Sequence, residues 1–291
     1  MKSAVVAVVG RPSSGKSTLV NALCGGKVSI VSPVPQTTRN RVRGILTSAR
    51  GQLVLIDLPG FHLSEKKLNR YLTELVSGTL SEVDVVLYVV DGTRATGEEE
   101  HALRSVLRTA GRPLVACVNK ADSAGPGWDA EVREVTRALP GITPFAISAL
   151  TGAGLDALRD ALFSLAPEGD QLYPEEFYTD QTPDFRIAEI VREKAMLQTR
   201  EEVPHSLYVR LEDLEMRDEG ATLWARGFIC VERESQKGIL VGRAGERIKS
   251  IVHDAERELS EIFPYDVKLD IRVKVDREWR TRDPLLKKLI R

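Results

Sequence analysis

The chain contains 291 residues, of which 42% are hydrophobic and 29% are charged, and its formal net charge is −1. This composition predicts a soluble globular protein with room for one large or two modest domains. Because the net charge is close to zero, a basic field over the whole surface is excluded. Any nucleic-acid binding must therefore come from a local basic patch.

Three cysteines lie far apart in the chain, at Cys24, Cys117 and Cys230. Their spacing fits neither a disulfide framework nor a zinc cluster, so we expect reduced structural thiols. No apolar stretch approaches the ~20 residues of a membrane-spanning helix, and the sequence favours a cytoplasmic protein.

The first predicted element is a buried strand over residues 4–9, followed by a glycine-rich loop and a helix. This context favours a phosphate-binding loop of the form G-x-x-x-x-G-K-S over a simple turn before a helix. Its glycines turn backbone N–H groups toward a polyphosphate, and Lys16 offers its cation to the β and γ phosphates. The Ser17 hydroxyl is a ligand for Mg²⁺. The predicted nucleotide-binding residues here are Gly10, Arg11, Pro12, Ser13, Ser14, Gly15, Lys16, Ser17 and Thr18.

A polar segment with two prolines covers residues 27–43 and predicts a mobile or functional loop. A pair of strands over residues 44–49 and 52–56 comes next and ends in Asp57-Leu58-Pro59-Gly60. After a phosphate loop, Asp57 is expected to hold Mg²⁺ through water, and the Gly60 N–H is expected to reach a γ-phosphate.

Further strands are predicted over residues 84–90 and 114–118, separated by an amphipathic helix over residues 98–109 with Leu103, Val106 and Leu107 inward. The second strand leads into a sequence that selects the base, Asn119-Lys120-Ala121-Asp122. A carboxylate accepts from both N1–H and the exocyclic amine of guanine, a donor pair that adenine lacks. The asparagine can brace the base and the phosphate loop, and the lysine stem can cover the ring.

A last strand is predicted over residues 142–147, followed by Ser148-Ala149-Leu150, whose backbone N–H groups are expected to reach the guanine carbonyl. A helix over residues 155–165, with Leu165 among its inward residues, closes this part of the chain. The alternation of strands and helices predicts an α/β domain over residues 1–166, with a doubly wound, mostly parallel sheet. Its site would lie at the carboxyl ends of the strands.

Residues 167–182 are acidic and proline-rich without a helical or alternating period, and they predict a linker. Beyond it, residues 183–291 predict an α+β domain with a C-terminal tail. A helix over residues 185–197 precedes two strands, over 207–211 and 221–231. A Gly-x-x-Gly sequence follows, then a long helix from Ile248 onward and a strand over 267–275.

Gly-x-x-Gly is a weak motif alone, but this order of elements is that of a KH module of the second topology, whose loop clamps single-stranded nucleotides. Free amides at the helix ends and nearby cations can meet phosphates. The same cations could instead form a solvated helix face. The predicted RNA-binding residues are Lys237, Gly242, Arg243, Ala244, Gly245, Arg247 and Lys249.

The full set of motifs resembles the bacterial Era family of GTPases, and so does the stretch from Glu189 to His205. The resemblance implies a Ras-like G domain and a type II KH domain that use GTP, GDP and Mg²⁺. It implies binding to the 3′ end of 16S rRNA, no DNA partner, and a role in maturation of the small ribosomal subunit. It also implies that Thr38 is the switch threonine that closes on Mg²⁺ and the γ-phosphate, so the predicted catalytic residues are Lys16, Thr38 and Gly60. Family members are cytoplasmic, with some peripheral contact with the inner membrane.

Three positions near the γ-phosphate site qualify this resemblance. Phe61 stands where many GTPases place a water-orienting glutamine, so we expect slow hydrolysis that rests on charges and backbone amides. Ser13 replaces the asparagine that is usual in the family and that helps to seat a monovalent cation. His62 is interpreted as a surface switch residue rather than a base.

Two further functions are weighed against a GTP-hydrolysing switch that docks on ribosomal RNA. In one, the chain is an RNA-binding module whose nucleotide site is structural and turns over little. The sequence disfavours it, because Thr38 and its loop would then serve no static purpose. In the other, the chain is a small-molecule kinase, which the guanine-selective sequence and the KH module disfavour.

Overall fold

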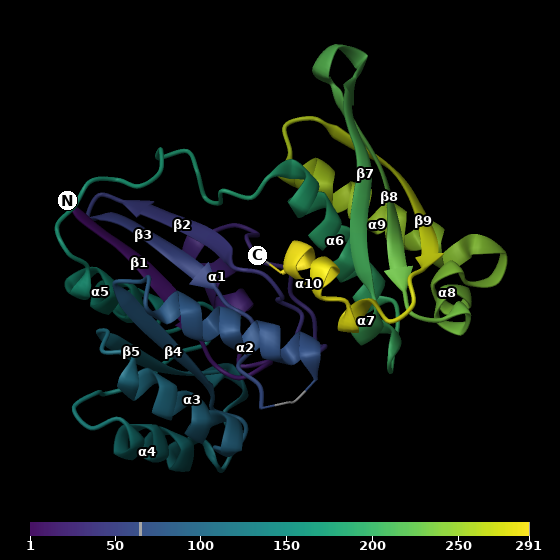
Figure 1. Cartoon of the computed structure of the whole chain (residues 1–291). Coiled ribbons are helices and arrows are strands. Elements are labelled where there is room, and N and C mark those ends of the chain that lie inside the picture. The colour runs from purple at the N-terminus through teal and green to yellow at the C-terminus, as the bar shows by residue number, and fades with distance from the viewer. Residues whose placement is uncertain (64–65, 291) are drawn as a thin grey trace. The chain divides into compact units, whose positions relative to one another are not determined.

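The computed structural model in Figure 1 describes residues 1–63 and 66–290. It divides into two compact units. The first contains Met1–Val31, Thr38–Asp180 and the C-terminal residues from Lys287. The second contains Ser32–Thr37 and Gln181–Leu286. The short segment Ser32–Thr37 thus belongs to the second unit, although both of its flanks belong to the first.

The first unit is built on a six-stranded sheet with the order β2-β3-β1-β4-β5-β6, in which only β2 is antiparallel to its neighbour. Strands β1, β3, β4 and β5 are almost completely buried, as their continuous apolar runs predict. Their carboxyl ends meet at one edge of the sheet, where α/β proteins bind ligands. The strands are β1 (Lys2–Val9), β2 (Val42–Ser48), β3 (Gly51–Asp57), β4 (Val85–Asp91), β5 (Leu114–Asn119) and β6 (Phe145–Ala146).

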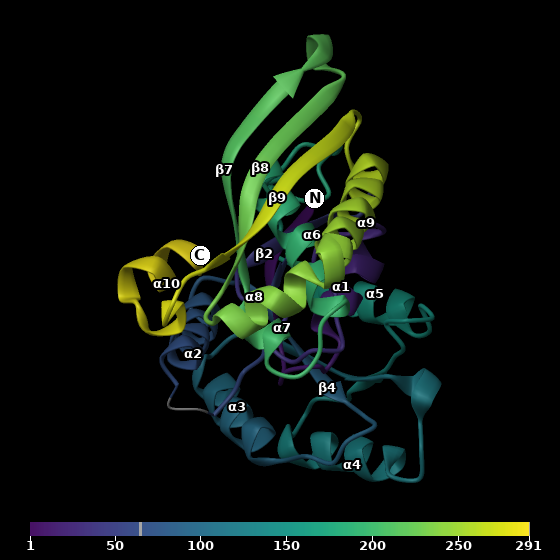
Figure 2. The ribbon, with the colours of Figure 1, turned by 90° about the vertical axis from the view of Figure 1, so that its right-hand side faces the viewer.

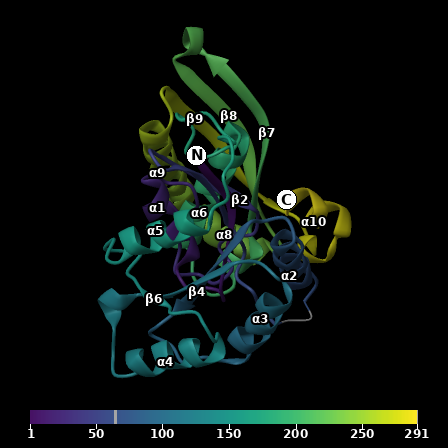
Figure 3. The same cartoon turned by 90° about the vertical axis from the view of Figure 1, so that its left-hand side faces the viewer.

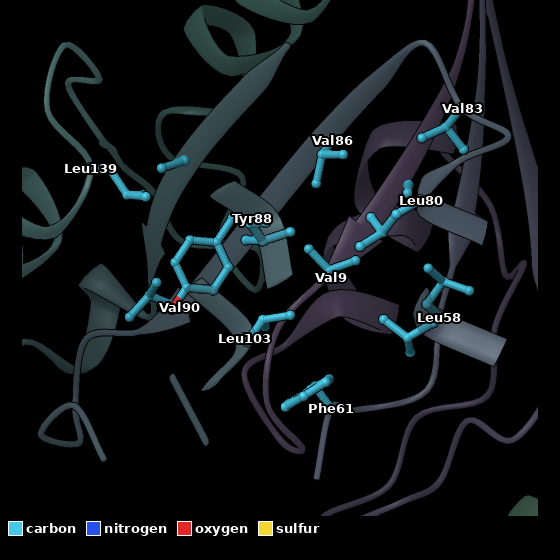
Figure 4. Packing of buried hydrophobic residues seen from close by; sticks show 14 of the residues in the cluster. Val9, Leu58, Phe61, Leu80, Val83, Val86, Tyr88, Val90, Leu103 and Leu139 are labelled. Carbon is cyan, nitrogen blue, oxygen red and sulfur yellow. The ribbon is translucent and has the colours of Figure 1, made fainter. Parts of the chain in front are cut away.

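Helices cover this sheet, and Figures 1 and 3 show their arrangement around it. Helices α2, α3 and α4 contribute to one buried cluster with residues of β1, β3, β4 and β5, seen from close by in Figure 4. Helix α1 contacts β1, β2 and β3, and α5 contacts β1 and β5. The helices are α1 (Lys16–Cys24), α2 (Lys67–Leu80), α3 (Glu98–Thr109), α4 (Trp128–Ala138) and α5 (Leu155–Leu165), with a 3₁₀ turn at Ala121–Ser123.

Two expectations about the end of this unit are wrong. The last strand is only Phe145–Ala146, because Pro144 lacks an N–H and the segment lies at the edge of the sheet. In α5, Leu165 is 43% exposed, and the buried position beside Leu162 is taken by Phe163. Within the described residues all three cysteines are free thiols, as expected.

The segment that follows α5 is held against the first unit by hydrogen bonds. The fully buried Gln52 side chain accepts from the N–H groups of Leu172 and Tyr173, both at 2.9 Å, and donates to the Tyr173 carbonyl at 2.8 Å. The Ile45 N–H donates to the Tyr178 carbonyl at 2.9 Å. The part of the predicted linker up to Asp180 therefore belongs to the first unit and is hydrogen-bonded to β2 and β3.

The second unit is a three-stranded sheet with the order β7-β8-β9, in which β7 is antiparallel and β9 parallel to β8. Helices α6 and α9 contact each other, α6 also contacts β7 and α9 contacts β9; Figure 2 shows this sheet with its helices. The parallel pair β8 and β9 is joined through α8 and α9, which confirms the predicted order of elements. The elements are α6 (Pro183–Leu197), α7 (Val203–Ser206), β7 (Tyr208–Arg217), β8 (Thr222–Val231), α8 (Glu234–Val241), α9 (Glu246–Ile262) and β9 (Asp266–Val275).

Strand β7 is longer than the predicted residues 207–211, because it stays paired with β8 up to Arg217 after a register shift between Leu211 and Asp213. The added stretch is acidic and exposed, and its composition alone does not predict a strand. Pairing with β8 and the ion pair between Asp213 and Arg226 stabilise it there. Helix α10 (Asp283–Leu289) follows β9. No helix among the described residues is long and apolar enough to span a membrane.

Candidate nucleotide site and nucleic-acid interface

The loop between β1 and α1 curls around the ammonium group of Lys16. Lys16 Nζ donates to the carbonyl of Gly10 at 3.2 Å and to that of Arg11 at 2.9 Å, and the residue is only 5% exposed. Gly15 has φ +91°, and a Cβ there would lie 2.2 Å from Asn119 Nδ2, so only glycine fits. Burial lowers the pKa of Lys16 to about 8, while Asp57 and Glu99 act in the opposite direction. A buried cation is therefore held ready for an anion.

The Arg11 side chain points away from the loop, toward α3. Its Nε lies 2.7 Å from Glu100 Oε1, and both side chains are buried. Its other nitrogens donate to the carbonyls of Arg94 and Ala95 at 3.4 and 3.3 Å. Only the backbone of Arg11 is thus left to contribute to an anion site.

Three oxygen-bearing side chains from distant parts of the first unit meet beside this loop. Ser17 Oγ donates to Asp57 Oδ2 at 2.7 Å and lies 2.8 Å from Thr38 Oγ1, and Thr38 Oγ1 lies 3.2 Å from Asp57 Oδ2. Asp57 is fully buried, and burial raises its pKa, against the effect of the hydroxyls and of Lys16. Its other oxygen, Oδ1, is buried and has no hydrogen-bond partner among the described residues. Hydroxyl and carboxylate oxygens with a spare buried acceptor fit a hard cation such as Mg²⁺.

The sequence after Asp57 packs tightly on the phosphate loop. The Phe61 N–H donates to the Gly10 carbonyl at 3.0 Å, and a Cβ on Gly60 would lie 2.6 Å from the Pro12 Cα. Leu58 and the Phe61 ring are buried in the core cluster shown in Figure 4. Phe61 therefore cannot orient a water, as its chemistry predicts.

His62 follows Phe61 and pairs through Nδ1 with Glu99 at the start of α3. Its side chain is 37% exposed, in line with its interpretation as a surface residue. The segment 57–80 begins at Asp57 and Gly60, so we expect it to move with the γ-phosphate. Its residues 64 and 65 lie outside the described residues.

Asn119 joins the base-selecting sequence to the phosphate loop, as expected. Its Nδ2 donates to the Ser14 carbonyl at 2.9 Å, and its Oδ1 accepts from the Ala149 N–H at 2.9 Å. The Ala149 N–H thus braces Asn119 in this structure, and the guanine contact expected of it stays a prediction. Leu150 next to it is 77% exposed.

Asp122 and Lys120 lie on the loop that follows β5. Asp122 accepts from the hydroxyls of Ser148 and Ser123, which lower the pKa of its carboxyl. Lys120 Nζ donates to Asp91 Oδ2 at 2.7 Å, so the lysine stem is held in place by a buried carboxylate. Sequence reasoning missed Asp91, although the signal was present: like Asp57, it is the last residue of an apolar strand.

The Gly-x-x-Gly sequence forms a tight turn between α8 and α9 in the second unit. Gly242, Ala244 and Gly245 have φ values of +74°, +50° and +79°. Arg243 and Ala244 at the tip are exposed, and Lys249 is exposed on the first turns of α9. Lys237 on α8 and Arg247 are half-buried, and Arg247 Nη1 donates to the Ile239 carbonyl. The structure thus brings the seven predicted residues to one helix–turn–helix, with the Arg247 guanidinium bonded to a backbone carbonyl of α8 at the protein surface.

The fold and the two sites define a P-loop nucleotide-binding domain of the GTPase type, followed by a KH domain. Family models agree: residues 5–120 match "50S ribosome-binding GTPase" and residues 202–280 match "KH domain".

The chain is 49% identical to GTPase Era of Treponema denticola over 99% of both chains, and 41% identical to GTPase Era of Borreliella afzelii over the whole of both. Among solved structures it resembles a variant of Aquifex aeolicus Era bound to GDP·AlF4⁻, with 37% identity, a TM-score of 0.93 and 99% of each chain covered. It also resembles the structure of Era in complex with MgGDPNP and nucleotides 1506–1542 of 16S ribosomal RNA, with 37% identity and a TM-score of 0.93. The match covers 99% of this chain and 98% of that one. The chain belongs to the GTPase Era family.

Proposed function

We propose that this GTPase hydrolyses GTP at the loop between β1 and α1 and binds the 3′ end of 16S rRNA through its KH domain, in maturation of the small ribosomal subunit. The observation that carries the proposal is the contact among the side chains of Ser17, Thr38 and Asp57. A nucleotide site that only stabilises the fold would not need a hydroxyl from the 27–43 loop beside the other two groups. The RNA part is supported by the Era–rRNA complex that the chain resembles over its whole length.

The residues of the first site have distinct roles in this proposal. Backbone N–H groups of residues 13–18 and the Lys16 ammonium bind the phosphates, and the Gly60 N–H faces the γ-phosphate. Ser17 and Thr38 would hold Mg²⁺ directly and Asp57 through water; the ion would neutralise phosphate charge. With Phe61 buried, hydrolysis depends on these charges and is slow.

Guanine is selected by the loops after β5 and β6. The Asp122 carboxylate accepts from N1–H and the exocyclic amine, and the Lys120 stem lies on the ring. The backbone of residues 148–150 is assigned to the guanine carbonyl, although without the base the Ala149 N–H donates to Asn119 and the Ser148 N–H to the Ala153 carbonyl.

Single-stranded RNA is clamped by Gly242-Arg243-Ala244-Gly245, where phosphates approach the backbone closely. Lys237, Arg247 and Lys249 contribute positive charge around it. We place the protein in the cytoplasm, with peripheral contact with the inner membrane as a further proposal.

Two measurements test the proposal. Multiple-turnover phosphate release from GTP is expected for the original chain and should fall to background in Lys16→Ala; the absence of turnover in the original chain would leave only a structural nucleotide site. Binding of a 16S rRNA 3′-end oligonucleotide should collapse in the double variant Arg243→Asp/Ala244→Asp. The matched control is Arg257→Asp, which places a negative charge farther along α9 beside Asp254; an equal loss in this control would contradict the loop assignment.

A further inference from the structure

The segment Ser32–Thr37 has a fixed internal structure within the second unit. The Val34 N–H donates to Ser32 Oγ at 3.1 Å, and Thr37 Oγ1 donates to the Val34 carbonyl at 2.6 Å. Since the Thr37 proton is used there, the 2.7 Å contact between the two hydroxyls must run from Ser32 Oγ to Thr37 Oγ1. The three bonds form a closed ring, so this part of the 27–43 loop is an ordered turn.

A buried arginine of α6 binds this turn at its last residue. Arg192 Nη2 donates to the Thr37 carbonyl at 2.6 Å, and both residues lie in the second unit. The Arg192 side chain is only 3% exposed. Its Nε donates to Glu189 Oε1 at 2.7 Å and its Nη2 donates to Glu189 Oε2 at 2.6 Å. The guanidinium plane is thereby fixed, and its remaining donor directions with it.

The carbonyl that Arg192 holds belongs to the peptide unit of Thr38. The chain contains no cis peptide bond within the described residues, so the Thr37 carbonyl and the Thr38 N–H point in opposite directions in one plane. Holding the carbonyl therefore sets the orientation of Thr38. The hydroxyl of the same residue, Thr38, lies 2.8 Å from Ser17 Oγ and 3.2 Å from Asp57 Oδ2.

We propose that Arg192 is a positioning residue for Thr38: from the RNA-binding unit, it fixes the peptide that presents the Thr38 hydroxyl to Mg²⁺ and the γ-phosphate. This inference rests on the proposed role of Thr38. It assigns to α6, which lies outside the nucleotide-binding unit, a direct part in distinguishing GTP from GDP.

The proposal requires a loss that is specific for the triphosphate. In Arg192→Met the Thr37 carbonyl loses its charged donor, and affinity for a non-hydrolysable GTP analogue with Mg²⁺ should fall about tenfold, the usual scale for a hydrogen bond to a charged group. Affinity for GDP should change by less than about twofold, because Thr38 is assigned no contact with GDP. Arg192→Lys keeps the charge beside Glu189 but lacks the fork that reaches two acceptors. It should keep the thermal stability of the original chain and still lose the preference for the analogue.

A control variant and a double variant show whether Arg192 positions Thr38 or only stabilises helix α6. Lys194→Met removes an ion pair of the same helix with Glu258 and does not touch Thr37. It should leave both affinities unchanged. In the Thr38→Ala background, Arg192→Met should add no further loss of analogue affinity, because the two residues act through one contact.

Three results would overturn the inference: equal losses for GDP and the analogue in Arg192→Met, an equal effect of Lys194→Met, or full additivity with Thr38→Ala. These outcomes are distinct from failure of the proposed function. If the original chain neither turns over GTP nor responds to Thr38→Ala, the role of Thr38 itself is wrong. If Thr38→Ala lowers analogue affinity and Arg192→Met does not, only the role of Arg192 is wrong.

Discussion

Asn119 is predicted to stabilise the fold of the first unit as well as to bind the base. It is 2% exposed, and its side chain hydrogen-bonds two backbone groups in a buried setting, the Ser14 carbonyl and the Ala149 N–H. In Asn119→Ala both groups lose this partner. Each buried unsatisfied group costs about 1–3 kcal/mol, so the variant should lose roughly 2–6 kcal/mol of unfolding free energy. For a unit of this size, at about 2–4 °C per kcal/mol, that loss corresponds to a fall in Tm of about 4–24 °C.

The assay is urea and thermal unfolding of the nucleotide-free chain, followed by circular dichroism. Ser123→Ala is the matched control, because it removes an exposed hydrogen bond to Asp122 in the same loop and should change stability by less than about 0.5 kcal/mol. Nucleotide affinity should fall in Asn119→Ala even for ligands that lack a base, such as a triphosphate, because the phosphate loop is no longer braced. An Asn119→Ala variant as stable as the control would refute the bracing.

Three further predictions concern the same unit. Asp122→Asn swaps an acceptor pair for an acceptor and a donor, so GTP affinity should fall on the order of 10²-fold and XTP binding should rise; unchanged binding of both nucleotides would contradict the guanine assignment. Because burial lowers the pKa of Lys16 to about 8 and bound phosphates favour the ammonium form, GDP affinity should be constant below pH 8 and fall above it, by at most about tenfold per pH unit. Calorimetry in buffers of different ionisation enthalpy should show proton uptake at pH 9, and none would contradict the pKa. Because Ser13 is shorter than asparagine, hydrolysis should differ little between potassium and sodium, and Ser13→Asn should gain a potassium response; strong potassium stimulation of the original chain would show that another group fills this role.

The nucleotide-binding fold could be predicted because its signals are local. An apolar run that ends in a glycine loop or in Asp57 specifies both a buried strand and the chemistry at its end. The same logic would have found Asp91, which also follows such a run. Helix α2 was missed, although Leu68, Leu72 and Val76 recur at helical spacing and are buried in it.

Other features depend on contacts that no sequence window contains. Strand β7 extends to Arg217 because β8 pairs with it, and β6 is short because Pro144 interrupts an edge. The role that we assign to Arg192 depends on a carbonyl 155 positions away in the chain. Its residue type and its place on an amphipathic helix predict only a surface cation.

The direct test of the whole account is the affinity for a 16S rRNA 3′-end oligonucleotide, measured with GDP and with a non-hydrolysable GTP analogue, for the original chain and for Thr38→Ala. We expect the analogue to favour RNA binding in the original chain, within the ~1–3 kcal/mol usual for coupled sites, and Thr38→Ala to erase the difference. Equal RNA affinities in all four cases would mean that the two domains are tethered but not coupled, and would contradict the switch that we assign to Thr38.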